Sequence, residues 1–153
     1  MKKFVNRQSS GQSILEVLFA TTVVALVLVA VLSTIIASLR NARISMEQAQ
    51  ATSYASEALE WLRHQRDGQG WIPFKEQAIA DVYCLPSLPA DITGLNSAAG
   101  ACVNNPIPNT SFVRELTIDH LPNDEIQTTV TVTRPSRSGP AVTTLEGRFN
   151  QWQ

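Results

Sequence analysis

A stretch of 23 residues without a charged side chain, Val17 to Leu39, limits most strongly what this chain can fold into. A helix needs about 20 apolar residues to cross the hydrocarbon core of a bilayer. Because the backbone must satisfy its own hydrogen bonds in lipid, the stretch predicts a transmembrane helix. A secretory signal peptide has a shorter apolar core, about 7 to 15 residues, and a small-residue cleavage site, and no such site precedes Arg40. An uncleaved signal anchor is the stronger alternative.

Basic residues lie on both sides of this stretch. Lys2, Lys3 and Arg7 precede it, and Arg40 and Arg43 follow it. The balance favours a cytoplasmic N-terminus by a small margin. We therefore expect a single-pass protein of the cytoplasmic (inner) membrane, with a cytoplasmic leader and an extracytoplasmic head.

Two cysteines, Cys84 and Cys102, lie beyond the apolar stretch. An even pair at this spacing suits a disulfide in an oxidising compartment, which agrees with an exported C-terminal part. Such a bridge would tether a proline-rich segment and would contribute about 3 kcal/mol in the entropy model. Two free buried thiols are the alternative.

The helix is expected to continue beyond the membrane. Residues 41–66 contain no glycine or proline, and their apolar side chains recur every three or four positions, which makes one stripe along a helix. The stripe consists of Ala51, Ala55, Ala58, Leu59 and Leu62. Two glycines within residues 67–70 break the pattern, so one helix is predicted from about Ser13 to Arg66.

The C-terminal third of the chain changes to a period of two. Residues 112–119 and 126–133 alternate apolar and polar side chains, and a third such segment lies near 141–149, as is typical of half-buried antiparallel strands. Residues 71–109 contain five prolines and are predicted to be irregular, apart from a short strand at 81–85. This order predicts an α+β fold in which three or four antiparallel strands pack on the helix stripe.

These features divide the chain into four parts. They are a basic leader (1–11), the transmembrane half of the helix (12–40), its amphipathic half (41–66) and a globular head (67–153). After the apolar stretch roughly 110 residues remain, which is enough for one small core.

One carboxylate, Glu16, lies at the start of the apolar stretch. A carboxylate at the centre of a membrane helix costs about 2.5 to 3.5 kcal/mol on insertion scales, and less near the interface. A positive partner should therefore compensate it. The alternative is an interfacial glutamate that complements the helix macrodipole.

The basic leader, Gly11, Glu16 and the long helix that continues into an amphipathic half together resemble the type IV pilins and the pseudopilins of type II secretion. In that family a membrane prepilin peptidase cuts after the glycine, and the new N-terminus is methylated. The resemblance implies cleavage between Gly11 and Gln12, a type IV pilin-like fold, and a role for Glu16 in assembly opposite a subunit's new N-terminal amine. Many members have phenylalanine at the position of Gln12, so the resemblance leaves its methylation open.

The end of the chain resembles a smaller group within this family. The alternating segment 129–133, the segment 142–145 and a terminal Trp152 are similar to the minor pilins called pilus modification protein V and to the I-type minor pseudopilins. The implied function is a structural minor subunit of a filament, held in the membrane before assembly. Its implied partners are other pilin or pseudopilin subunits, the prepilin peptidase and the inner-membrane assembly platform. The alternatives are a minor pseudopilin of a secretion or competence system and, from another class, a membrane-anchored binding protein.

No enzyme or cofactor motif is found in the sequence. The histidines lack a helically spaced partner, the cysteines form no Cys-x-x-Cys pair, and no nucleotide or hydrolase fingerprint occurs. The residues Asp119, Asn123, Asp124 and Glu125 form a candidate calcium loop of oxygen ligands, with a solvated turn as the alternative. Nucleic acid is not an expected partner, because nine basic residues face thirteen acidic ones after the leader.

Overall fold

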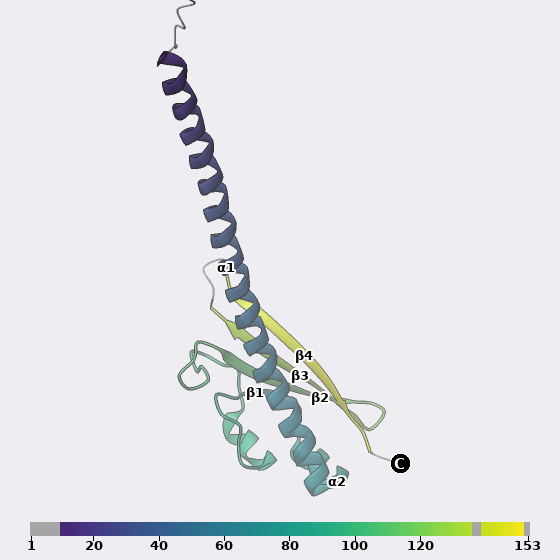
Figure 1. The fold of residues 1–153 in the computed structure, drawn as a ribbon. Helices are drawn as coiled ribbons and strands as arrows, with labels where there is room; N and C mark the ends of the chain where they lie inside the picture. Colours follow the sequence, from purple (N-terminus) through teal and green to yellow (C-terminus); the bar gives the residue numbers. More distant parts are fainter. Residues whose placement is uncertain (1–9, 136–138, 152–153) are drawn as a thin grey trace, which may run out of the picture. The chain divides into compact units, whose positions relative to one another are not determined.

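A computed structural model describes residues 10–135 and 139–151, with side chains from residue 14 onward (Figure 1). Residues 1–9 of the predicted leader and Trp152 of the predicted tail lie outside the described residues. The chain forms two compact units, Met1–Ser45 and Met46–Gln153. The helix α1 (Ser10–Gln69) contributes to both.

The first unit is the N-terminal part of α1. From Ile14 to Leu39 every side chain is exposed, and the hydroxyl groups of Thr21, Thr22, Ser33 and Thr34 donate hydrogen bonds to carbonyls three residues earlier, at 2.7–2.9 Å. These polar groups therefore need no external partner. Within the described part of the chain, this helix is the one that is long and apolar enough to cross a membrane.

The second unit begins with the C-terminal part of α1, whose predicted stripe is confirmed. All five stripe residues, Ala51, Ala55, Ala58, Leu59 and Leu62, are at most 6 % exposed. The helix extends three residues beyond the predicted end, to Gln69, and then breaks at Gly70, whose φ of 81° favours glycine.

The prediction of irregular structure from residue 71 was wrong in two places. A short helix, α2 (Trp71–Gln77), follows Gly70 directly, and a 3-10 helix, η1 (Ile92–Ala98), lies further on. Pro73 does not prevent α2, because it lies in the first turn, where backbone N–H groups have no helical partner in any case. The buried side chain of Phe74 anchors α2, and the Asp91 side chain caps η1 by accepting a hydrogen bond from the Gly94 amide at 3.1 Å.

The remaining elements form one antiparallel sheet in the order β1-β2-β3-β4. Its strands are β1 (Asp81–Cys84), β2 (Val113–Leu121), β3 (Glu125–Arg134) and β4 (Ala141–Phe149). The predicted alternation is confirmed, since Leu116, Ile118, Ile126, Val130 and Val132 are all buried on one face. Asp124 has a φ of 60° in the turn between β2 and β3, as short hairpin loops require of one residue.

Helix and sheet share one core. Figure 1 shows the C-terminal part of α1 lying across one face of the sheet, and the α1 stripe belongs to the same buried cluster as the inward side chains of β2 and β3. At one end of this core the Phe74 and Phe149 rings lie 5.6 Å apart, and the Arg66 guanidinium lies 5.5 Å from the centre of the Phe149 ring. The second unit is thus an α+β head with a four-stranded sheet, as predicted.

Candidate functional site

The residues that the sequence singles out for processing and assembly lie at the start of α1. Gly11 and Gln12 are within the helix, and Glu16 follows in the same uninterrupted helix with an exposed side chain. The described residues provide no hydrogen bond or ion pair for the Glu16 carboxylate.

The surface around Glu16 is apolar on all sides of the helix. Leu15 is 72 % exposed, Val17 59 % and Leu18 62 %, and they point in different directions around the axis because one helical turn takes about 3.6 residues. A helix that is apolar all round is normally covered by lipid or by other helices. The first unit thus offers a long helical surface with no covering element among the described residues.

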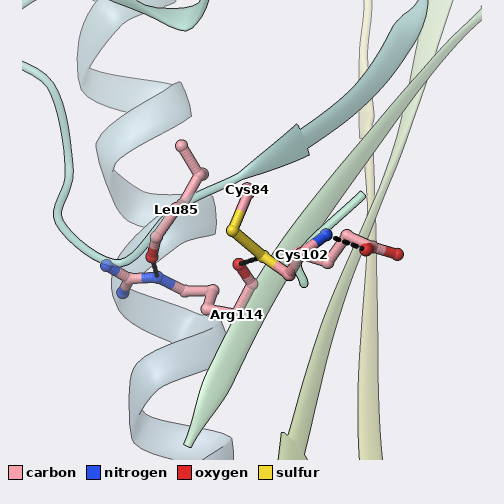
Figure 2. The surroundings of a disulfide bond; sticks show 5 residues. Cys84, Leu85, Cys102 and Arg114 are labelled. Carbon is pink, nitrogen blue, oxygen red and sulfur yellow. Dashed lines mark hydrogen bonds between the residues drawn. A yellow bond between two sulfur atoms is a disulfide. The ribbon is translucent and has the colours of Figure 1, made fainter. Parts of the chain in front are cut away.

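The head contains the predicted disulfide between Cys84 and Cys102 (Figure 2). Cys84 ends β1, and Cys102 lies in the loop that leads to β2. The Cys102 amide donates a hydrogen bond to the Glu115 carboxylate at 3.1 Å, and Cys102 Sγ lies 3.2 Å from the carbonyl oxygen of Arg114. The bridge therefore fastens the loop to the end of β1, and the contacts of Cys102 hold the loop against the start of β2.

Next to the bridge lies a buried arginine that sequence reasoning did not single out. Arg114 is 2 % exposed, and its Nε donates to the Leu85 carbonyl at 3.1 Å (Figure 2). Its Nη1 donates to the Tyr54 carbonyl at 3.1 Å and to the Glu57 carboxylate at 2.7 Å. One side chain thus joins α1, the segment after β1, and β2. A charged residue at an inward position of an alternating strand was the sequence signal that could have identified it.

A second arginine makes a similar connection on the neighbouring strand, at the same end of the sheet. Arg134, the last residue of β3, forms an ion pair with Glu47 of α1, and their side chains are only 17 % and 22 % exposed. This pair ties the end of β3 to the helix. The two arginines act as polar links between sheet and helix.

One residue of the candidate calcium loop, Asp124, lies against the helix α2. The Asp124 carboxylate accepts a hydrogen bond from Trp71 Nε1 at 3.1 Å and pairs with Lys75, so it holds α2 against the turn between β2 and β3. The hydrogen bond from Lys75, followed by that from Trp71, lowers the pKa of Asp124 below its ordinary value. Asp119 and Glu125 lie within β2 and β3.

Among the residues that the structure describes, no three His, Cys, Asp or Glu side chains come close enough to hold a metal ion. Asn123 lies in the turn beside Asp124, but the four predicted residues are not brought together as a ligand set. The structure instead assigns Asp124 to the packing of the head.

The described parts define a class of protein: a disulfide-bonded α+β head joined to a helix that is long and apolar enough to cross a membrane. Comparisons with protein-family models, with curated proteins and with solved structures find no match to this chain. The function is therefore argued from the residues themselves.

Proposed function

We propose that this chain is a structural minor subunit of a type IV pilus or a related filament, cut by a prepilin peptidase and assembled through its N-terminal helix. The observation that carries the proposal is the combination of Gly11 and Glu16 at the start of one helix that remains unbroken from Ser10 to Gln69. An inert membrane anchor requires neither the glycine nor the acid. It also does not require the helix to continue into the core of the head.

Cleavage between Gly11 and Gln12 would supply a cation for Glu16, which has no ion-pair partner among the described residues. The new N-terminal amine on Gln12 lies four residues before Glu16, and residues four apart are neighbours on a helix surface. The same amine on an adjacent subunit would serve equally well. In an apolar environment an ion pair of this kind relieves the cost of the isolated carboxylate, so helix-to-helix assembly would depend on processing.

The exposed apolar surface of the first unit suits both stages of such a life cycle. Lipid covers the helix before assembly, and the helices of neighbouring subunits cover it afterwards. The similarity of the end of the chain to minor pilins and I-type pseudopilins favours a low-copy subunit. Which filament it joins, a pilus or a secretion pseudopilus, depends on the assembly platform in the same cell.

The proposal is tested by expressing the chain with an active prepilin peptidase and measuring the mass of the membrane-extracted protein. We expect a chain that begins at Gln12, and we expect the variant Gly11→Val to remain uncut. Ser9→Val is the matched control, because it adds the same side chain outside the scissile bond and should be processed. An intact chain, in cells where a known prepilin is cut, would overturn the proposal.

A second variant separates assembly from processing. Glu16→Gln keeps the size of the side chain and removes its charge, so we expect normal cleavage but loss of co-purification with other filament subunits. If Gly11→Val and Glu16→Gln both function like the wild type, the chain is a membrane-anchored binding protein.

A further inference from the structure

A cleft of about 520 Å³ lies in the head between α1, the segment that leads into β2, and the end of β3. Its volume is within the range of about 300 to 1,000 Å³ that is typical of small-molecule sites. It is lined by Glu47, Gln50 and Tyr54 of α1, by residues 109–112 before β2, and by Arg134 at the end of β3. All of these residues belong to the second unit, so the cleft is a feature of the head alone.

The two walls of the cleft are fixed by the fold of the head. On one wall, Gln50 and Tyr54 are four residues apart on α1 and therefore share one face of the helix. On the other wall, the amide and the hydroxyl of Thr110 both donate hydrogen bonds to the Ile107 carbonyl, at 3.0 and 2.8 Å, and so close a turn. The rings of Tyr54 and Phe112 lie 5.4 Å apart and bring the two walls together. The cleft is therefore formed before any ligand binds.

Polar side chains at the cleft are available to a ligand. In the part of the chain that the structure describes, no residue hydrogen-bonds to the amide groups of Gln50 and Asn109 or to the hydroxyl group of Tyr54. Gln50 and Asn109 are exposed, and Tyr54 is half-buried. Asn109 has a φ of 61°, in the left-handed region that asparagine tolerates. Each of these three groups can both donate and accept a hydrogen bond.

The charged residues that line the cleft neutralise each other. Glu47 and Arg134 form an ion pair, and their side chains are only 22 % and 17 % exposed. No other described residue of the lining carries a charge. An anionic ligand would have to compete with Glu47 for the guanidinium group, and a cationic ligand would have to compete with Arg134 for the carboxylate. The cleft therefore favours a neutral, polar ligand.

We propose that this cleft binds a neutral saccharide of one or two rings. The hydroxyl groups of a sugar both donate and accept hydrogen bonds, which matches the amides of Gln50 and Asn109 and the hydroxyl of Tyr54. The C–H face of a sugar ring can pack on the half-buried Tyr54 ring, as apolar surface does in small-molecule sites. An extended peptide fits less well, because it binds by pairing with an open strand edge. The strands that border the cleft, β2 and β3, are both paired on two sides.

Saturation-transfer difference NMR on the full, uncleaved chain tests the proposal. The chain is kept in micelles of lauryldimethylamine oxide, because glucoside and maltoside detergents carry sugar headgroups that would compete. The probes are maltose, cellobiose, lactose and diacetylchitobiose. We expect saturable binding of at least one of them, with a Kd in the millimolar range because the cleft is open to solvent. If none of these sugars binds, the proposal is wrong. Because no peptidase is present, this result is independent of whether the chain is processed as a pilin.

A double variant, Gln50→Ala with Asn109→Gly, locates the site. It removes both amides, and the fold should be kept because alanine suits a helix and glycine suits a positive φ. We expect the double variant to bind the sugar about ten-fold more weakly. The matched control is Gln48→Ala with Asn104→Gly. Gln48 is an exposed residue of α1, Asn104 is exposed with a φ of 52°, and neither lines the cleft, so the control should bind like the wild type. Equal binding by the double variant and the wild type would place the sugar elsewhere and overturn the proposal.

Further probes test the class of the ligand. Glucuronic acid and glucosamine carry a charge and should bind no more tightly than glucose, because Glu47 and Arg134 already neutralise each other. An uncharged triglycine, acetylated and amidated at its ends, should show no saturable binding. Tighter binding of a charged sugar or of the peptide would contradict the proposal. Near-ultraviolet circular dichroism of each variant checks that the head remains folded.

Discussion

Replacing Arg114 with methionine should destabilise the head far more than removing the charge of its partner Glu57. The reason lies in how differently the two side chains are placed. Arg114 is 2 % exposed, whereas the Glu57 side chain is 56 % exposed. The Glu57 carboxylate can therefore form hydrogen bonds with water when the ion pair is lost. The carbonyl groups that accept hydrogen bonds from Arg114 cannot all do so.

The size of the effect follows from the bonds that are lost. The Leu85 carbonyl would lose the donor that Arg114 Nε provides, and Leu85 itself is 1 % exposed. A buried carbonyl without a partner costs about 1–3 kcal/mol. The Tyr54 carbonyl loses less, because it belongs to a helix and keeps its helical hydrogen bond. Methionine fills much of the vacated volume, and the cost of burying a guanidinium disappears, which offsets part of the loss.

We therefore expect Arg114→Met to lower the free energy of unfolding by about 2 kcal/mol, or the melting temperature by about 10 °C for a domain of this size. Glu57→Gln should cost less than about 1 kcal/mol, as exposed ion pairs do. Arg63→Met, at an exposed position of α1, is the control and should stay within about 0.5 kcal/mol of the wild type. Thermal unfolding of the full chain in detergent, followed by near-ultraviolet circular dichroism, measures all three.

Two results would refute this reasoning. Equal destabilisation by Arg114→Met and Glu57→Gln would mean that the ion pair, not the buried carbonyl, carries the energy. An unchanged melting temperature for Arg114→Met would mean that the Leu85 carbonyl finds water or another donor.

Three further predictions concern the head. Replacing Cys84 and Cys102 with serine should lower the free energy of unfolding by about 3 kcal/mol, since it reopens a loop of 18 residues, and denaturant titration measures this loss. The pKa of Asp124 is lowered chiefly by its hydrogen bond from Lys75. The ionised carboxylate therefore contributes its full share to the stability of the head above about pH 4, and this share is lost as the pH falls through the folded-state pKa. In Asp124→Asn the melting temperature should depend less steeply on pH in the acid range. Burial raises the pKa of Tyr83, so stability should fall as the pH rises above about 10, and this alkaline loss should shrink in Tyr83→Phe.

The elements that follow from local periodicity were predictable from the sequence. The stripe that includes Ala55 and Leu62 and the alternation of β2, β3 and β4 are repeated patterns, so each can be recognised without knowing its neighbours. The helix α2 was missed because proline was treated as a breaker, although Pro73 lies where a helix tolerates it.

The polar links could not be predicted in the same way. Arg114 and Glu57 are 57 residues apart, and Lys75 and Asp124 are 49 residues apart. Their meeting depends on the sheet register and on the angle at which the helix crosses the sheet, and neither is encoded in a local window. The residues of the proposed processing site, in contrast, stand out in the sequence because their spacing is fixed within one helix.

The position of Arg114 late in the chain has a consequence for how an exported head would mature. If the head is exported, as the proposed function implies, the C-terminal part of α1 would leave a translocation channel first, and the side chain that joins it to Leu85 would arrive only with β2, after the loop that contains Cys102. Until then the alanine stripe has no sheet to lie against, and Cys84 has no partner held in place. Oxidation before β2 emerges would close the loop around an unfilled space, so a chaperone that holds the chain unfolded, or a slow oxidant, would favour the native order of events.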